Sequence, residues 1–283
     1  MLCGAIAMLS GCSALRIAYG TAPDLVYWWL DGYVDFTDDQ TPRVRESLKQ
    51  WFAWHRRTQL PDYAALLTRA QVEITADTTP ARVCEWQGEI TKRAHVAFDH
   101  IAPATAELML TSTAQQLQHL ERRYLKYNDK FRDEYLQRDP RKRSEATLKR
   151  AKDRIESLYG DLDDSQVAFL ADALARSPFD PEQWLEERKA RQQLALQMAH
   201  RLGSDGATKE QAQAALRTYI EQLERSPRPE YRRYVEKLAA FNCNFAARLH
   251  NLTRPDQRRF AVSKLDGWAG DLRALAAAAD QVR

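Results

Sequence analysis

The chain has 283 residues, of which 44% are hydrophobic and 29% charged, so it carries enough apolar side chains for one large core or two small ones. Its 42 basic and 39 acidic residues leave a net charge of +3, too close to balance for the field that drives nonspecific binding of nucleic acid. Beyond the first eleven residues, no apolar run approaches the roughly 20 residues that a membrane-spanning helix needs.

The N-terminal segment resembles that of a bacterial lipoprotein. Residues 2–9 are apolar and small, and they lead into Leu9-Ser10-Gly11-Cys12, which is similar to the lipobox that precedes an acylated cysteine. The resemblance implies that residues 1–11 are a signal peptide, that cleavage occurs before Cys12, and that Cys12 carries lipid. Two or more acyl chains would anchor the protein stably, because each buried methylene adds about 0.8 kcal/mol.

Two neighbouring features bear on this assignment. Ser13 rather than Asp follows the cysteine, which in such lipoproteins implies sorting to the outer membrane, facing the periplasm. No Lys or Arg precedes Arg16, whereas a signal peptide normally begins with positive charge, so we expect the true start upstream of Met1.

Residues 12–35 form an aromatic-rich entry segment that contains Tyr27, Trp28 and Trp29. Tyr and Trp favour the membrane interface, and lipid on Cys12 would bring them close to it. These three residues are therefore a candidate membrane or partner surface. The alternative is that they pack in the core.

Residues 36–283 are predicted to form an all-α domain, because apolar residues recur at helical spacing and no stretch shows sustained strand alternation. Helix starts are predicted at the capping box Thr37-Asp38-Asp39-Gln40, at Pro61 and at Pro80, and a helix end near Pro103. The longest periodic segment, residues 117–131, is followed by a break at Asp139-Pro140.

The second part of the chain carries equally clear helix boundaries. They are Gly160 as a stop, Asp163 as a cap, Pro181, the capping box of Thr208 and Gln211, Pro229, and Pro255. We expect about nine helices in an elongated bundle, forming one domain of two lobes with a boundary near residues 139–140.

A basic helix follows this boundary and begins with Arg141, Lys142 and Arg143. Such a helix could face anionic headgroups or lipopolysaccharide phosphates, each nearby charge adding about 1 kcal/mol. The alternative is a solvated surface, since Glu145 and Asp153 balance part of the charge.

Two cysteines, Cys84 and Cys243, remain in the predicted domain, where an oxidising periplasm would allow one disulfide between them. The alternative is that both are small buried apolar residues, because each lies beside aromatic residues on a predicted helix.

Only one cluster suggests catalysis. Asp31, Asp35, Asp38 and Asp39 could supply an acid and a base or hold a hard cation, but aspartates in the first turn of a helix also complement its dipole. His95 and His100 are five residues apart and so do not share a helical face. The sequence therefore predicts no enzyme, no cofactor and no metal site.

Three stretches resemble signature blocks of a family of uncharacterised proteobacterial lipoproteins. They are Tyr27-Trp28-Trp29-Leu30-Asp31 through Trp51-Phe52-Ala53-Trp54-His55-Arg56-Arg57; Pro178-Phe179-Asp180-Pro181 with Trp184; and Phe241-Asn242-Cys243-Asn244-Phe245 with Leu249-His250-Asn251 and Gln257-Arg258-Arg259. The resemblance covers most of the mature chain and implies its location and helical fold, but no activity.

A weaker resemblance is to periplasmic stress chaperones of the Spy type, whose helices open with Leu-Thr-x-x-Gln. Residues 67–71 match this motif, residues 36–40 and 162–166 match in part, and Leu252-Thr253 reaches Gln257 one residue late.

The leading hypothesis is a lipid-anchored, non-enzymatic helical protein that binds an envelope partner protein. The alternatives are a chaperone-like cradle for periplasmic clients and a cell-envelope hydrolase that uses the cluster from Asp31 to Asp39.

Overall fold

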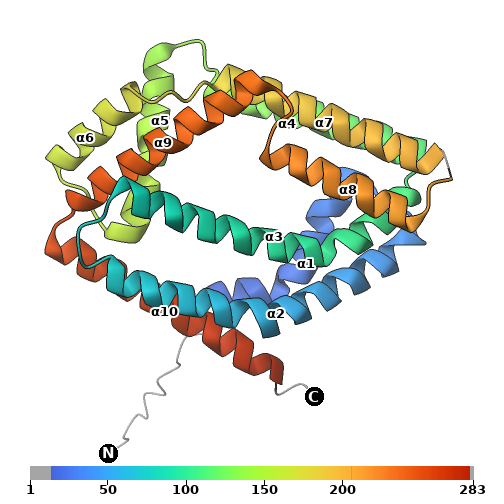
Figure 1. Ribbon diagram of the computed structural model, residues 1–283, viewed down its shortest axis with the longest axis horizontal. Coiled ribbons are helices and arrows are strands. Elements are labelled where there is room, and N and C mark those ends of the chain that lie inside the picture. Colours follow the sequence, from blue (N-terminus) through green and yellow to red (C-terminus); the bar gives the residue numbers. More distant parts are fainter. Residues whose placement is uncertain (1–13, 205, 281–283) are drawn as a thin grey trace, which may run out of the picture.

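The computed structural model describes residues 14–204 and 206–280, and within them it contains ten α-helices and no strand (Figure 1). The predicted all-α class is therefore confirmed, with one helix more than the expected nine or so. The helices are α1 (Ala14–Val34), α2 (Gln40–Glu73), α3 (Pro80–Leu110), α4 (Ala114–Tyr135), α5 (Pro140–Tyr159), α6 (Asp164–Ala175), α7 (Pro181–Ser204), α8 (Lys209–Glu224), α9 (Pro229–Asn251) and α10 (Pro255–Asp280).

Most predicted helix boundaries are present. The Thr37 amide donates to Gln40 Oε1 (3.1 Å) and the Gln40 amide donates to Thr37 Oγ1 (3.3 Å), so the predicted capping box forms just before α2. Asp139 caps α5 through the Arg141 amide. Gly160 ends α5 with a φ of 74°, a conformation that favours glycine.

Two predicted boundaries are wrong, because Pro61 lies inside α2 and Pro103 inside α3. A proline inside a helix removes one hydrogen bond and costs about 3 kcal/mol. Both prolines are close to the most deeply buried residues of their helices. Leu60 and Ala64 are 2% and 1% exposed, and Ala106 is fully buried. Packing of these residues offsets the lost hydrogen bond, so each helix continues.

The helices form two similar halves, α1–α4 and α5–α10. In the second half, α5 corresponds to α1 and α10 to α4. The pair α6 and α7 corresponds to the single helix α2, and the pair α8 and α9 to the single helix α3. Within the halves, α1 packs on α2 and α4 as α5 packs on α6 and α10. Between them, α2 packs along α10 as α4 packs along α7, and α3 contacts both α8 and α9. Figure 1 shows these two long pairs on opposite sides of the molecule. The contacts are those of a two-fold arrangement within one chain.

The arrangement is open. The accessible surface of 17989 Å² exceeds the roughly 12,400 Å² expected of a compact protein of this mass. The residues outside the described ranges contribute at most about 170 Å² each to this surface, the value for an unfolded chain, which is too little to account for the difference. One buried cluster joins α3, α7 and α8 through Ala106, Met198, Leu202, Ala212 and Leu216. The fold therefore presents much helix surface around a thin core.

A disulfide between Cys84 and Cys243 joins α3 of the first half to α9 of the second, with 5.5 Å between the two Cα atoms. Cys243 is 2% exposed. Among the described residues, no helix has the length and apolar character needed to cross a bilayer.

Candidate functional site

The main exposed apolar surface near the N-terminus lies on α1. Ile17, Leu25, Trp28 and Trp29 are 61%, 52%, 61% and 59% exposed, and we call them the α1 stripe. At 100° of rotation per residue, these side chains occupy an arc of about 120° on one side of the helix. Large apolar side chains gathered on one side of an exposed helix make this surface a candidate for interaction.

The opposite side of α1 is fixed to α2 and to the turn before it. The Tyr19 hydroxyl and His55 Nδ1 form a hydrogen bond of 2.8 Å, and the Tyr19 ring meets Phe52 edge-on at 5.6 Å between centroids. The hydroxyls of Tyr27 and Thr41 are 3.0 Å apart. These contacts orient α1 so that its stripe faces outward.

Tyr27 does not belong to the exposed surface that the sequence suggested for it with Trp28 and Trp29. Its side chain is 6% exposed and packs against Phe36, with 5.8 Å between the ring centroids. Consecutive residues of a helix are 100° apart, so a buried tyrosine can directly precede an exposed tryptophan.

The charged residues of α1 are engaged by other parts of the protein. Arg16 Nε is 3.0 Å from Asp271 Oδ1, and Asp24 Oδ1 accepts a hydrogen bond of 2.9 Å from Arg45. Asp31 Oδ1 accepts a hydrogen bond of 3.0 Å from the Phe36 amide. The stripe itself consists of uncharged side chains.

Burial perturbs the groups that join α1 to α2. It raises the pKa of Tyr19 to about 12, although the nearby Arg56 acts in the opposite direction. Burial also lowers the pKa of His55, whose ring stacks on Trp51 with 4.6 Å between centroids. Trp51 Nε1 donates to the Ala97 carbonyl at 2.8 Å. A neutral His55 therefore serves as a packed hydrogen-bonding partner of Tyr19.

Of the aspartates that suggested catalysis, Asp31 lies in the last turn of α1 and the other three lie between α1 and α2. Asp31 holds the Phe36 amide, and Asp35 adopts a left-handed conformation with a φ of 59°. Asp35, Asp38 and Asp39 are exposed. Two cavities of the described chain are lined by residues of α7, α8 and the segment 225–232, and these aspartates line neither. Their arrangement gives the hydrolase hypothesis no support.

A buried pair of glutamines joins the start of α2 to the start of α4. Gln40 and Gln116 are 6% and 3% exposed, and each side-chain amide donates to the other at 3.4 and 2.6 Å. Gln40 Nε2 also donates to the Thr111 carbonyl (3.0 Å), and Gln116 Nε2 donates to the Asp35 carbonyl (2.9 Å). The pair thus satisfies two loop carbonyls that have no partner within a helix.

The second half repeats this junction between α6 and α10. Gln166 and Gln257, both 2% exposed, donate to each other at 2.8 and 2.9 Å, to the Leu252 carbonyl (2.9 Å) and to the Asp161 carbonyl (2.8 Å). In both junctions each glutamine donates to a carbonyl that lies five residues before its partner glutamine. Each glutamine oxygen also accepts a hydrogen bond from the backbone amide three residues before that glutamine. The repeated bonds support the division into two halves.

The motif Thr113-x-x-Gln116 is one that the sequence analysis missed. Its only local signal is that of an ordinary capping box, and its pairing with Gln40 joins residues far apart in the chain. The matching segment 67–71 has a different role, because it lies inside α2, where the Thr68 hydroxyl donates to the Ala64 carbonyl.

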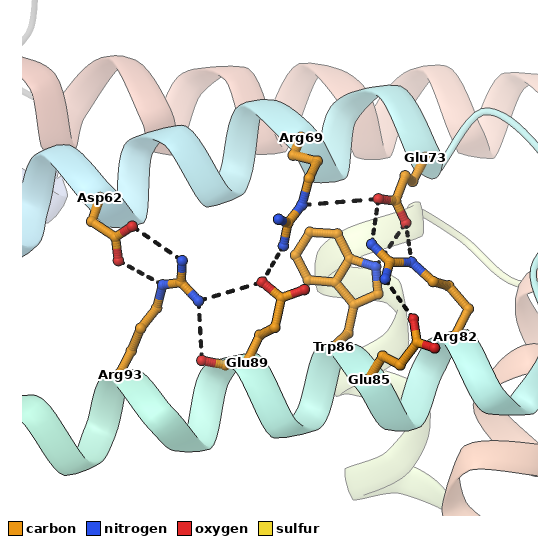
Figure 2. A network of polar contacts seen from close by, with 8 residues as sticks. All are labelled: Asp62, Arg69, Glu73, Arg82, Glu85, Trp86, Glu89 and Arg93. Carbon is orange, nitrogen blue, oxygen red and sulfur yellow. Dashed lines mark hydrogen bonds and ion pairs between the residues drawn. The ribbon is translucent and has the colours of Figure 1, made fainter.

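A network of arginines and carboxylates connects α2 to α3 (Figure 2). Arg82 donates to both oxygens of Glu73, at 2.7 and 2.6 Å, and to Glu85 at 2.6 Å. Trp86 Nε1 donates to Glu73 at 2.9 Å. The hydrogen bond from Arg82 is the main reason why the pKa of Glu73 falls to about 2.

The same network extends along both helices. Arg93 donates to the two oxygens of Asp62 at 2.6 and 3.1 Å, and Arg69 bridges Glu73 and Glu89. Each of these carboxylates already has an arginine partner. The network therefore holds α2 and α3 together.

A cavity of about 270 Å³ lies between α7 and α8, beside the buried Glu187. Glu187 is 2% exposed and accepts hydrogen bonds from Arg191 (2.9 Å) and Arg228 (2.8 Å). Burial alone raises the pKa of Glu187, but hydrogen bonds from Arg228, Ser226 and Arg191 outweigh it and hold that pKa below its usual value. The ion pairs brace this corner of the fold.

The other residues singled out by sequence are dispersed. Arg141, Lys142 and Arg143 are exposed at the start of α5, a helix that packs on α6, α10 and α4. Cys12 and Ser13 lie outside the described residues. Among the described residues, no three His, Cys, Asp or Glu side chains are grouped as metal ligands would be.

Comparison with known proteins identifies a family without assigning an activity. No curated protein and no solved structure matches the chain. A family model described as a family of unknown function, DUF6279, matches residues 32–232, from the end of α1 to the first turn of α9. Since the match covers more than half of the sequence, the chain belongs to the DUF6279 family.

Proposed function

We propose that this protein is a lipid-anchored, non-enzymatic helical scaffold that binds a partner protein at the periplasmic face of the outer membrane. The lipobox-like sequence that ends at Cys12 is the basis for the anchor and the location. The observation that carries the scaffold role is the open helical framework, whose surface is far larger than that of a compact protein of its mass.

The polar groups of the structure support a binding role over a catalytic one. The buried glutamines, Glu187 and the network of Figure 2 all satisfy groups within the fold. Large apolar side chains are instead exposed on several helices, including Ile90 on α3, Leu125 on α4 and Phe260 on α10. Such side chains provide the apolar anchors of protein interfaces.

Mass spectrometry of the protein purified from membranes tests the anchor. We expect an N-terminus at Cys12 that carries diacylglycerol and an amide-linked acyl chain. The Cys12→Ser variant should lack the acyl mass. An unacylated N-terminus that retains the first eleven residues would contradict the proposal.

Affinity capture from envelope extracts tests the scaffold role. The tagged chain should enrich an envelope protein relative to an unrelated helical lipoprotein of similar size. The Leu125→Ser and Phe260→Ser variants test whether exposed apolar side chains carry that binding. Capture of nothing beyond the control would oppose the partner hypothesis.

A second candidate is a chaperone-like cradle for periplasmic clients. It is favoured by the four motifs that end in Gln40, Gln116, Gln166 and Gln257 and lie at helix starts, together with the exposed apolar side chains. This role predicts suppression of client aggregation at substoichiometric amounts. Light scattering of a client that aggregates on dilution from urea, without reductant, checks it, and unchanged scattering would rule the role out.

A further inference from the structure

The described part of the chain leaves the α1 stripe largely exposed. Trp28 and Trp29 are 61% and 59% exposed, although the same helix buries Tyr27 and holds Tyr19 against α2. The stripe extends from Ile17 to Trp29, about 18 Å along the helix axis at 1.5 Å per residue. It therefore occupies most of the length of α1.

The position of α1 in the chain indicates what covers the stripe. α1 begins at Ala14, two residues after Cys12, so at most about 7 Å separates their Cα atoms. If Cys12 carries lipid, the first turn of α1 must therefore lie at the bilayer surface. An upright helix would place Trp28 about 21 Å from Ala14, whereas a helix lying flat would bring the whole stripe to the surface.

The chemistry of the stripe matches the bilayer interface. Tryptophan is enriched there because its ring is apolar and its N–H remains hydrated. The α1 charges nearest the stripe are paired, Arg16 with Asp271 and Asp24 with Arg45, so fewer uncompensated charges oppose contact with lipid. An amphipathic helix that lies in the interface buries such a side by only about 5–10 Å.

From these observations we infer that α1 lies flat on the lipid surface through Ile17, Leu25, Trp28 and Trp29, so that the bilayer orients the whole helical domain. This inference rests on the proposed lipid anchor. It goes further because an anchor alone would leave the domain free to rotate on its tether. Since α1 is fixed to α2, α4 and α10, the contact also determines which helices face away from the membrane.

Quenching by brominated lipid tests the orientation in the native lipidated chain. In vesicles of phosphatidylethanolamine and phosphatidylglycerol brominated near the top of the acyl chains, the tryptophan fluorescence should be quenched. The Trp28→Phe/Trp29→Phe variant should stay on the vesicles through its lipid and lose most of that quenching. Equal quenching of this variant would assign the signal to other tryptophans and overturn the inference.

Partitioning without lipid tests the stripe itself. The chain from residue 12 onward with Cys12→Ser, which lacks both the acyl chains and the apolar leader, should bind the same vesicles weakly. Trp28→Ser/Trp29→Ser should lower the partition coefficient about tenfold or more. The control Val72→Ser, which changes a side chain 71% exposed on α2, should alter it less than about twofold.

These measurements distinguish the two failures. A chain that is not acylated in cells refutes the anchor. An acylated, vesicle-bound chain whose Trp28 and Trp29 escape quenching refutes the flat orientation and leaves the anchor intact. If the Cys12→Ser chain instead forms dimers that Trp28→Ser/Trp29→Ser abolishes, without partitioning, the stripe is covered by a second copy and the inference is wrong.

Discussion

The glutamine junction between α6 and α10 provides a quantitative test of the fold. Replacing Gln166 with leucine keeps the side-chain volume roughly constant but removes four hydrogen bonds. Gln166 donates to the Leu252 carbonyl and to Gln257, and its side-chain oxygen accepts from Gln257 and from the Asp163 amide. Each bond contributes about 1 kcal/mol net, and the Leu252 carbonyl and Asp163 amide lose partners. We therefore expect Gln166→Leu to lower the free energy of unfolding by about 3–5 kcal/mol.

A matched control exists in α8, where Gln211 completes a capping box without pairing to a second glutamine. Among the described residues, its side-chain oxygen accepts a hydrogen bond from the exposed Thr208 amide, at 2.8 Å. Gln211→Leu should therefore cost about 0.5–1 kcal/mol. Urea unfolding followed by circular dichroism measures both variants as shifts in midpoint at constant slope.

The equivalent junction in the first half extends this test. Gln116→Leu should cost about as much as Gln166→Leu, because it removes the corresponding bonds to Gln40, Asp35 and Thr113. A double-mutant cycle of Gln166 with Gln257 should yield a coupling energy of about 1–2 kcal/mol. The reasoning fails if Gln166→Leu costs no more than Gln211→Leu.

Two further perturbations have defined outcomes. Cys84→Ser/Cys243→Ser should lower the free energy of unfolding by about 5 kcal/mol in the chain-entropy model, since the bridge spans 159 residues, and thiol counting on the denatured, nonreduced chain should find neither thiol free. Arg82 lowers the pKa of Glu73 to about 2 in the folded protein, against about 4.5 in the unfolded chain. The ion pair of the Glu73 carboxylate with Arg82 therefore stabilises the fold fully above about pH 4.5. That contribution should disappear as pH falls from about 4.5 to 2. After allowance for solvent screening it amounts to about 1 kcal/mol. Glu73→Gln should therefore flatten the acid branch of stability against pH, and an unchanged branch would contradict the role of this ion pair.

Local signals in the sequence predicted many of the helix boundaries. A cap such as Thr37 with Gln40, or a stop such as Gly160, acts through neighbouring residues and can be recognised without knowledge of the fold. The predictions at Pro61 and Pro103 were wrong because α2 and α3 are stabilised at these prolines by side chains buried against other helices. That energy depends on contacts between distant parts of the chain.

The candidate site was only partly predictable for the same reason. The aromatic entry segment identified Trp28 and Trp29, but helical periodicity alone does not specify which side of α1 meets α2, so Tyr27 was grouped with them. Each glutamine junction joins two helix caps that lie tens of residues apart in the chain, so neither cap alone predicts the pairing. Gln40 meets Gln116, and Gln166 meets Gln257, only after the helices between them have packed.

The two halves make similar contacts between helices but differ in how many helices they contain. This difference determines how many copies of a binding surface one molecule offers. A dimer of identical four-helix subunits would offer every recognition surface twice. Here α2 and α3 are continuous, whereas their equivalents are divided into α6 with α7 and α8 with α9. The corner that contains Glu187 lies at the break between α8 and α9, and the continuous α3 of the first half has no such break. A ligand that recognises this corner should bind with a stoichiometry of one, and either half can change through mutation without altering its counterpart.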